Sequence, residues 1–421
     1  MVVVESASIA NVKIQDKRDF SWLDKLAKKA VLAVCKRLQR GHLTIEDNGE
    51  VYRFGEPAEK AEIIAHIQVH QYSAYRDVFF HGSIGSGEAY MRGAWTSPDL
   101  LNVIQLWVAN AKILDKMDNE RPWISRFMAK ILHSFNENSR FGSRKNISAH
   151  YDLGNDFFKL FLDKTMMYSS AVFPEKTSTL EEGSLHKLEL LCQKLQLTDS
   201  DHLLEIGTGW GGLAVYAAKN YGCKVTTTTI SKEQHDYAQQ RVDELGLQNQ
   251  VTVLLEDYRD LRGQYDKLVS VEMIEAVGHE YYADYFSRCS QLLKAGGLMA
   301  IQAITISDQR YQQAKQSVDF IQRYIFPGGC LPSNEVIASC VSRHTDMHII
   351  DLQDITAHYA RTLRLWREAF FSELEQVKTQ GFDDVFCRMW EFYLCYCEGG
   401  FRERVISTGQ FVFAKPDYRF S

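Results

Sequence analysis

Short apolar runs alternate with amphipathic stretches through the second half of the chain. Runs rich in β-branched residues predict buried strands, and apolar residues that recur every three or four positions predict helices. The predicted strands cover residues 202–207, 224–231, 250–258, 266–275 and 298–306. The predicted helices cover residues 211–221, 232–247 and 285–294, the last one closed by Ala295-Gly296-Gly297. This alternation predicts an α/β fold, in which helices cover both faces of a mostly parallel sheet.

The N-terminal part of the chain follows another pattern. Residues 25–40 predict a basic amphipathic helix. Residues 41–55 predict a hairpin, because Asn48-Gly49 between two short strands is a strong turn signal. We therefore expect a smaller N-terminal α+β domain over residues 1–120.

A second basic amphipathic helix is predicted at residues 123–135, and the polar stretch 136–146 that follows has the composition of a linker. Residues 121–147 are therefore predicted to connect the small domain to a larger one. The larger domain is predicted to cover residues 148–421.

The charge of the chain limits its partners. A formal net charge of -6 argues against general nucleic-acid binding, although the two basic helices are local exceptions. These helices could leave their charges in water or contact anionic lipid head groups, where each Lys or Arg contributes on the order of 1 kcal/mol. With no run of about 18 apolar residues and no signal peptide, we expect a cytoplasmic protein that is peripheral at the inner membrane face.

The nine cysteines are scattered along the chain, and their spacings match neither a zinc site nor a short disulfide framework. Reduced thiols and no bound metal are the simplest interpretation.

Four glycines mark a ligand site between the first predicted strand and the next helix, namely Gly207, Gly209, Gly211 and Gly212. Glycine there lets the backbone turn tightly and approach a nucleotide-like ligand. A dinucleotide site would need an acid about 20 positions later, where this chain has threonines at 226–229. Glu205 before the first glycine and Asp257 after the third strand favour S-adenosylmethionine instead.

Six segments carry a specific resemblance: HYDLGNDFF, MMYSSAVF, EIGTGWGG, TISKEQ, EDYRDL and YIFPGGCLPS, which start at residues 150, 166, 205, 229, 256 and 324. In this order the chain resembles the cyclopropane-fatty-acid synthase and mycolic-acid cyclopropane synthase family. The segment GSGEAYMRGAW is similar to the phospholipid-acting branch. The resemblance implies a Rossmann-like S-adenosylmethionine-dependent methyltransferase fold for the larger domain.

The resemblance also implies which residues hold the cofactor. It places Tyr151, Tyr168 and Ser169 around the methionine end, where aromatic faces attract a sulfonium by about 0.5–2 kcal/mol. It places Gly207 and Gly209 under the nucleoside and Gln234 at the ribose. The other expected cofactor residues are Glu205, Trp210, Gly211, Thr229, Ile230, Asp257 and Tyr258.

Methylating an isolated alkene requires a dry pocket, because the carbocation that forms must be kept from water. Aromatic faces stabilise such a cation. The candidate pocket residues are aromatic and lie in the last hundred residues: Tyr324, Phe326, Trp390, Phe392, Tyr393, Tyr396 and Phe401.

A base must then remove a proton, and the resemblance implies a bound bicarbonate in this role. Its ligands would include Glu275, Tyr359 and the backbone of Ile304. Two positions depart from the family pattern, because Gln302 stands where a His is expected and Ser170 replaces a Cys. The amide and the serine backbone can still donate hydrogen bonds. The loss of the imidazole leaves two outcomes open, namely closure to a cyclopropane or a methylene- or methyl-branched chain.

The leading hypothesis is an enzyme that transfers a methyl or methylene group to the double bond of an unsaturated phospholipid in a membrane, with a cyclopropane as the expected product. A homodimer is a candidate assembly. One alternative is a methyltransferase for a small amine or carbon acid. Another is a lipid-binding protein without catalysis, against which the acids and glycines of the predicted site argue.

Overall fold

The computed structural model describes residues 21–111 and 153–419, which form two compact units. Of the described residues, the first unit contains 21–111, 319–321 and 367–405, and the second contains the remainder. The predicted helix and linker at 121–147 lie outside the described residues, so the domain boundary there stays a prediction.

The first unit contains a four-stranded sheet with strand order β2-β1-β3-β4. Its strands are β1 (His42–Asp47), β2 (Glu50–Gly55), β3 (Ile64–Val69) and β4 (Trp95–Thr96). The hairpin predicted from Asn48-Gly49 is confirmed, because β1 and β2 pair antiparallel. Asn48 and Gly49 both have positive φ, at 49° and 84°, which is the backbone conformation of a tight Asn-Gly hairpin turn. The helices of the N-terminal part are α1 (Trp22–Cys35), α2 (Ser73–Met91) and α3 (Leu100–Ala109). The first of these ends five residues before the predicted end at residue 40.

Helix α17 (Asp384–Arg402) belongs to this first unit although it lies near the end of the chain. Gly399 allows close packing, because a Cβ at this position would lie 2.7 Å from Ile104 of α3. The buried Glu398 pairs with Arg367 at 3.0 Å and with Arg402 at 2.5 Å. The N-terminal unit is therefore completed by residues from the far end of the sequence.

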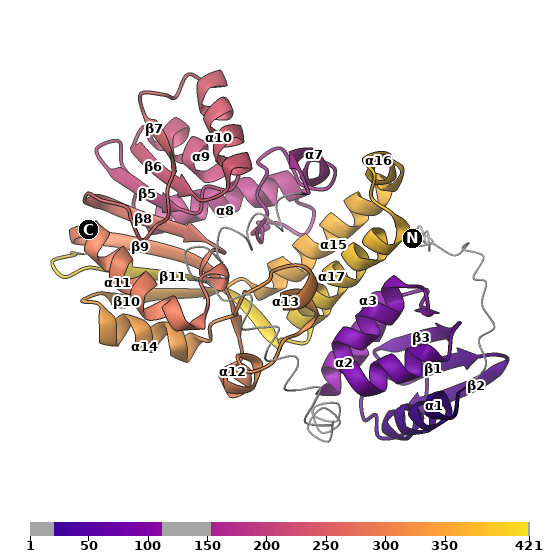
Figure 1. Cartoon of the computed structure of the whole chain (residues 1–421). Helices are drawn as coiled ribbons and strands as arrows, with labels where there is room; N and C mark the ends of the chain where they lie inside the picture. Colours follow the sequence, from indigo (N-terminus) through magenta and orange to yellow (C-terminus); the bar gives the residue numbers. More distant parts are fainter. Residues whose placement is uncertain (1–20, 112–152, 420–421) are drawn as a thin grey trace. The chain divides into compact units, whose positions relative to one another are not determined.

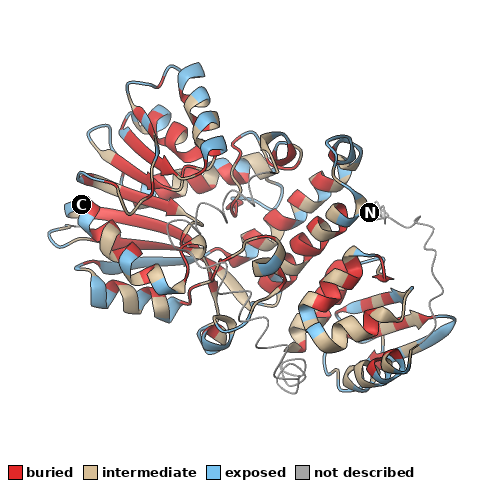
Figure 2. Cartoon of the chain, viewed as in Figure 1, coloured by how far each residue is buried: buried red, intermediate tan, exposed pale blue. Residues whose placement is uncertain are grey.

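The second unit is built on a seven-stranded sheet with order β10-β11-β9-β8-β5-β6-β7 (Figure 1). The parallel strands are β5 (His202–Ile206), β6 (Lys224–Thr229), β7 (Val251–Leu255), β8 (Tyr265–Val271) and β9 (Leu293–Ile306). Strand β11 (Ile406–Ala414) runs antiparallel to both β9 and β10 (His348–Asp354). The edge strand β10 is exposed, whereas the strands between the edges are largely buried (Figure 2).

Helices cover both faces of this sheet. One core joins Leu203 and Val269 to residues of α8, α9 and α10, and the other joins Leu204 and Leu268 to residues of α11 and α14. Because neighbouring strand residues point to opposite faces, the two cores lie on opposite sides. The predicted Rossmann-like α/β fold with a mostly parallel sheet is thereby confirmed.

The helices of this unit are α7 (Asn155–Phe158), α8 (Leu180–Lys194), α9 (Gly212–Tyr221), α10 (Lys232–Glu244), α11 (Tyr282–Leu292), α12 (Asp308–Ala314) and α14 (Asn334–His344), with the short 3₁₀ helices η1 (Ile274–Ala276) and η2 (His279–Tyr281). Three further helices are α13 (Phe320–Tyr324), α15 (Thr356–Ser372) and α16 (Leu374–Thr379).

Several predicted elements end before the predicted residue, and the ends of α11 and β8 matter most for the site. Helix α11 ends at Leu292 and strand β9 begins at Leu293, so Ala295-Gly296-Gly297 lies inside the strand instead of closing the helix. Hydrogen bonds from Gly296 N–H to Pro416 and from Lys415 N–H to Gly297 hold this segment, in which Gly296 has φ of 71°, against the C-terminal tail. Strand β8 ends at Val271, four residues before the predicted end at Glu275.

The strand order positions the site. Strand β5 lies between β6 and β8, so the connections leave it in opposite directions, and ligands of such sheets bind at the carboxyl ends beside this point. The glycine loop follows β5, and Glu272 to Glu275 follow β8. Within residues 21–111 and 153–419, no helix is both long and apolar enough to cross a bilayer.

Packing of α11 on the sheet gives a stability prediction. Phe286 is fully buried and contacts Tyr285 and Phe413 edge to face. We expect Phe286→Ala to lower the free energy of unfolding by about 3–5 kcal/mol, because it leaves a cavity. Urea denaturation followed by circular dichroism measures the change. Leu245→Ala, at a side chain that is 47% exposed, is the control and should lower the free energy of unfolding far less. An equal decrease in both variants would contradict the predicted core role of Phe286.

Candidate functional site

The glycine loop turns where the sequence predicts. Gly207, Gly209 and Gly211 have φ of 99°, 51° and 78°, a region that favours glycine. The N–H groups of Gly207 and Thr208 donate to the carbonyl of Thr228 at 3.0 and 3.1 Å, which ties the loop to the end of β6. A Cβ at Gly209 would have no atom within 4 Å, so the space above this residue is open to a ligand.

Glu205 lies under the loop at the end of β5. Its carboxylate is buried and accepts a hydrogen bond of 2.6 Å from the Thr227 hydroxyl. Burial raises the pKa of Glu205 to about 8, and no basic side chain of the described residues pairs with it. A buried carboxylate without its own cation fits a ligand that carries an ammonium group.

Gln234 starts helix α10 beside the same loop. Ser231 caps this helix, and the Thr229 hydroxyl donates to Oε1 of Gln234 at 3.0 Å. Strand β6 thus ends in Thr229, followed by Ile230, where a dinucleotide-binding sheet would present an acid. The buried amide of Gln234 lies in the region where the sequence predicts ribose binding.

Asp257 follows β7 as predicted, but its carboxylate has a partner within the chain. Arg259 donates to both of its oxygens, at 2.9 and 2.7 Å. The adjacent Tyr258 packs edge to face on Tyr285. Asp257 therefore fixes the loop conformation, and its carboxylate is engaged before any ligand binds.

An aromatic cluster surrounds Tyr168. Its ring lies 5.1 Å from that of Phe158 and 5.2 Å from that of Trp366, with Phe326 at 6.5 Å. Trp210 of the glycine loop also packs on Phe158, at 4.9 Å. The predicted Tyr168, Trp210 and Phe326 are therefore connected through one set of rings, whereas the predicted Tyr151 lies outside the described residues.

Lys187 is a site residue that the sequence interpretation missed. This lysine of α8 is fully buried, donates to the Ser169 hydroxyl at 2.7 Å and has a pKa lowered to about 8 by burial. Its position among the buried residues of an amphipathic helix was the available signal.

Glu275 lies on η1, directly after β8. Its Oε1 accepts a hydrogen bond from the backbone N–H of Ile304, so two of the residues assigned to the bicarbonate bind one another. Its Oε2 is buried and has no hydrogen-bond partner among the described residues. Burial, and then the charge of nearby Glu272, raises the pKa of Glu275 to about 8.

Glu272 is the second missed residue and organises the remaining predicted ones. Its carboxylate accepts hydrogen bonds from Ser170 N–H at 2.9 Å, Gln302 Nε2 at 2.8 Å and the Tyr359 hydroxyl at 2.6 Å. Gln302 is held in turn by Gln410, which donates to its Oε1 at 3.0 Å. A second acid three residues before Glu275, at the end of a buried strand, was the available signal.

The predicted bicarbonate does not fit this arrangement. Three of the five groups assigned to it, from Ser170, Gln302 and Tyr359, already bind the Glu272 carboxylate. A second anion at these donors would lie against a carboxylate of the chain, which is unfavourable in a buried site. The predicted ligands therefore come together, but around a side chain.

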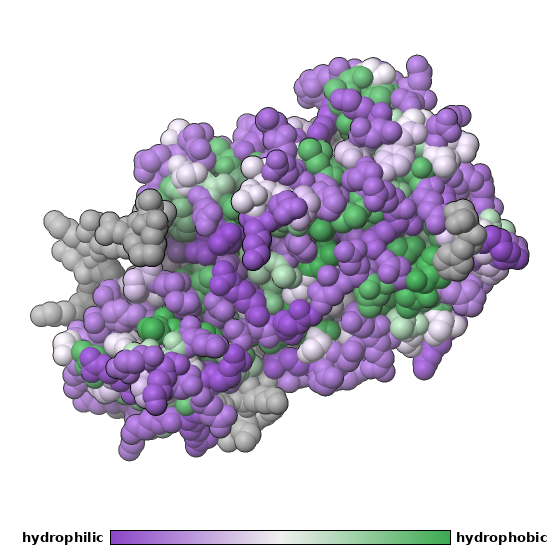
Figure 3. All heavy atoms as spheres, turned by 180° about the vertical axis from the view of Figure 1, so that it is seen from behind, coloured by the Kyte–Doolittle hydropathy of each residue, from purple (hydrophilic) through white to green (hydrophobic). Residues whose placement is uncertain are grey.

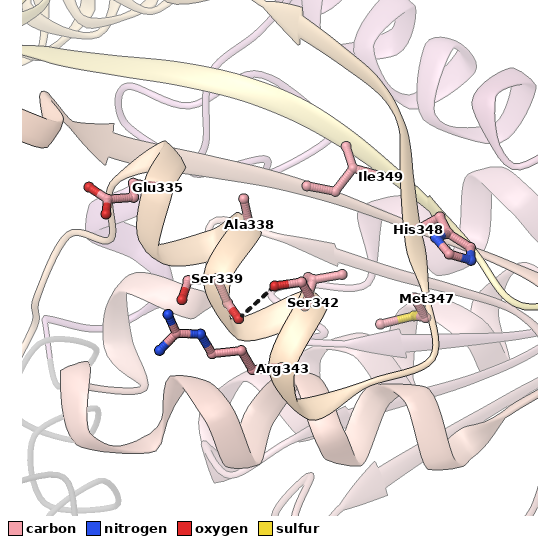
Figure 4. A pocket seen from close by; sticks show the side chains of 9 residues that line it. Glu335, Ala338, Ser339, Ser342, Arg343, Met347, His348 and Ile349 are labelled. Carbon is pink, nitrogen blue, oxygen red and sulfur yellow. Dashed lines mark hydrogen bonds between the residues drawn. The ribbon is translucent and has the colours of Figure 1, made fainter.

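The predicted aromatic residues of α17 belong to the first unit, where Phe392 packs on Tyr90 and Phe320. A separate pocket lies between α14 and β10, with Arg343 and His348 in its lining (Figure 4). None of the predicted site residues lines that pocket.

The sequence of this chain is similar to known lipid-modifying enzymes. A family model described as mycolic acid cyclopropane synthetase matches residues 138–411. Tuberculostearic acid methyltransferase UfaA1 of Mycobacterium tuberculosis is 41% identical over 339 residues, which are 79% of this chain and 79% of the relative. Cyclopropane-fatty-acyl-phospholipid synthase of Escherichia coli is 37% identical over 352 residues, 83% of this chain and 88% of that protein.

A solved structure is also similar to this chain. Mycolic acid cyclopropane synthase CmaA1 complexed with SAH and CTAB has a TM-score of 0.61 and 34% identity. The match covers 65% of this chain and 98% of that one.

The isolated carboxylate of Glu205 gives a pH prediction. Its folded pKa of about 8 lies above the unfolded value of about 4.3, so the native state holds an extra proton between these values. This contribution to stability is complete below about pH 4.3 and is lost as the pH rises toward 8. We expect Glu205→Gln to gain stability relative to wild type over this window, by at most about 1.4 kcal/mol per pH unit.

Urea denaturation of the ligand-free protein at pH 5, 6.5 and 8 measures this difference. Glu233→Gln removes an exposed carboxylate of the same unit and serves as the control. A constant difference between wild type and Glu205→Gln across the three pH values would contradict the prediction.

Proposed function

Because the chain belongs to the mycolic acid cyclopropane synthetase family, we propose that it methylates the double bond of an unsaturated acyl chain in a membrane phospholipid. The chain is an S-adenosylmethionine-dependent methyltransferase, and its family acts on unsaturated lipid chains. One observation carries the finer proposal: two carboxylates, Glu272 and Glu275, follow β8 at the sheet edge where the glycine loop follows β5. This edge can hold a methyl donor and also take up a proton.

The glycine loop and its surroundings support cofactor binding. We assign Gly207, Gly209 and Gly211 to the nucleoside and Glu205 to the ammonium group of the methionine part. Gln234, with Thr229 and Ile230 beside it, is assigned to the ribose. When bound, S-adenosylmethionine supplies a methyl group on a sulfonium, and the rings of Tyr168 and Tyr151 are assigned to this cation.

The aromatic cluster supports a hydrocarbon substrate. Tyr168, Phe158 and Trp366 present ring faces and edges without a buried charge of their own, which suits a dry cavity and a developing carbocation. A small amine substrate would need polar groups in the pocket, because these compensate for the water that the amine loses on binding. The cluster therefore favours the lipid hypothesis over the small-molecule alternative.

Two products are compatible with the initial methyl transfer. Ring closure gives the cyclopropane expected from the sequence, in line with the printed name of the Escherichia coli relative. Proton loss from a neighbouring chain carbon gives a methyl-branched alkene, or a methylene-branched chain when a hydride shift comes first, and the Mycobacterium tuberculosis relative is named a methyltransferase. The altered base site, with Glu272 bound by Gln302 and Ser170, is the observation that favours this second outcome.

Membrane contact is proposed for the exposed side of α1. Trp22 is 71% exposed and Leu26 is 54% exposed, and Lys25, Lys29 and Lys36 are exposed on the same helix or just after it. In the view from behind that of Figure 1, hydrophilic residues cover most of the visible surface, with smaller hydrophobic areas between them (Figure 3). A mixed apolar and basic surface suits an anionic bilayer, so we place the protein at the cytoplasmic side of the inner membrane. A homodimer stays a prediction.

Incubation with S-adenosylmethionine and vesicles of monounsaturated phospholipid tests the proposed function. We expect the acyl chains to gain carbon, and NMR distinguishes the ring from the branched alkene, which have equal mass. Vesicles of saturated phospholipid are the control and should give no product. Methylation of a soluble amine in place of the lipid would contradict the proposal.

Glu275→Gln tests the acid that follows β8. We expect turnover to fall, because Glu275 lies within electrostatic reach of Glu272 and its carboxyl group holds the Ile304 N–H at the same edge of the sheet. The affinity for S-adenosylmethionine, measured by calorimetry, should change little because Glu275 bonds to Ile304 and not to the glycine loop. Wild-type turnover in this variant would remove Glu275 from the mechanism.

A further inference from the structure

We propose that Glu272 is the catalytic base of this enzyme and that its carboxylate replaces the bicarbonate expected from the family. The inference rests on the proposed function, because it assigns the proton acceptor for the same reaction. It follows from the disagreement between the predicted bicarbonate ligands and the contacts they make.

The first support is geometric. Three donors from three separate segments converge on one carboxylate: Ser170 N–H before α8, Gln302 in β9 and Tyr359 in α15. All three were assigned to a planar CO₂-type anion from the sequence alone. A side-chain carboxylate has the same two-oxygen acceptor geometry, so Glu272 satisfies the donors that a free anion would otherwise need.

The second support is the backbone of Glu272. This residue has φ of 48°, in the left-handed region that favours glycine. Its N–H donates to the Gln302 carbonyl at 2.7 Å, which fixes this conformation. A non-glycine residue held in this region is strained, and such strain is found where function requires a particular side chain.

The third support is the division of charge between two acids. Burial raises the pKa of Glu272, while its three donors and the buried cation of Lys187 act in the opposite direction and favour the ionised form. Glu275 has only one donor, and its Oε2 has no partner among the described residues. One carboxylate and one carboxylic acid is the stable arrangement for two such neighbours. Glu272 is therefore the member of the pair that can accept a proton.

The chemical step balances with this base. The π electrons of the alkene form the new bond to the transferred methyl carbon, while the carbon–sulfur bond breaks and its electron pair stays on sulfur. Glu272 then takes a proton from the new methyl group, and the electron pair of that C–H bond closes the ring onto the cationic carbon. When the proton leaves a chain carbon next to the cation instead, the electron pair forms a C=C bond and gives a methyl-branched alkene. A 1,2-hydride shift that moves the cation to the methyl-bearing carbon, followed by proton loss from the methyl group, gives the methylene-branched chain. The protonated Glu272 returns its proton to water after product release.

The test compares wild type, Glu272→Gln and Glu272→Gly, each with S-adenosylmethionine and monounsaturated phospholipid vesicles, in argon-purged buffer with and without added bicarbonate. Wild type should keep its turnover without bicarbonate. Glu272→Gln should lose about 100-fold or more in both buffers, because the amide fills the space without basicity. Glu272→Gly removes the strain of the positive φ and leaves the donors of Ser170, Gln302 and Tyr359 without an acceptor. Added bicarbonate can then bind these donors and serve as the base, so it should raise the turnover of this variant at least tenfold.

Calorimetric titration with S-adenosylmethionine shows that each variant is folded, and Glu280→Gln, an exposed acid nearby, is the matched control. The inference is overturned if wild type loses its product without bicarbonate or if Glu272→Gln keeps wild-type turnover. It is also overturned if Glu272→Gly binds the cofactor but gains nothing from bicarbonate. Absence of lipid product from wild type under every condition would instead refute the proposed function.

Discussion

The parallel pairing of β5 with β8 is the constraint on which the site depends. Glu205 pairs in register with Val269, so the two strands end close together at one edge of the sheet. The glycine loop leaves β5 there, and Glu272 leaves β8 two residues after Ser270. A ligand group and a proton acceptor can be brought together only because no other strand separates these ends.

Burial of acids at this edge is unfavourable unless something compensates for it. Glu272 obtains three hydrogen bonds, whereas Glu205 has the Thr227 hydroxyl and Glu275 the Ile304 N–H. Burial raises the pKa of all three acids, and Glu272 has the most internal partners that oppose this effect. The pKa values of Glu205 and Glu275 are raised to about 8, so a bound cation or a proton is needed to satisfy these two carboxylates.

Much of the fold was predictable because its signals are local. The period of apolar residues gave β5, β6 and β7 to within a few residues, and Asn48-Gly49 gave the hairpin. The end of α11 was not predictable, because Gly296 and Gly297 are held in a strand by Pro416 and Lys415, which are distant in sequence. For the site, single residues such as Glu205 and Gln234 could be assigned from motifs. The role of Glu272 could not, because it depends on donors from residues 170, 302 and 359 that only the folded chain brings together.

The placement of α17 has a consequence for synthesis of the protein. Helices α1 to α3 of the α+β unit are synthesised before the methyltransferase sheet, yet the core of this unit includes Trp390 and Phe392 of α17, with the buried Glu398. The nascent N-terminal segment must wait through the synthesis of strands β5 to β10 before its packing is complete. Contacts that span more than three hundred positions slow this closure and leave apolar surface uncovered meanwhile, which makes the half-made chain a natural client for chaperones.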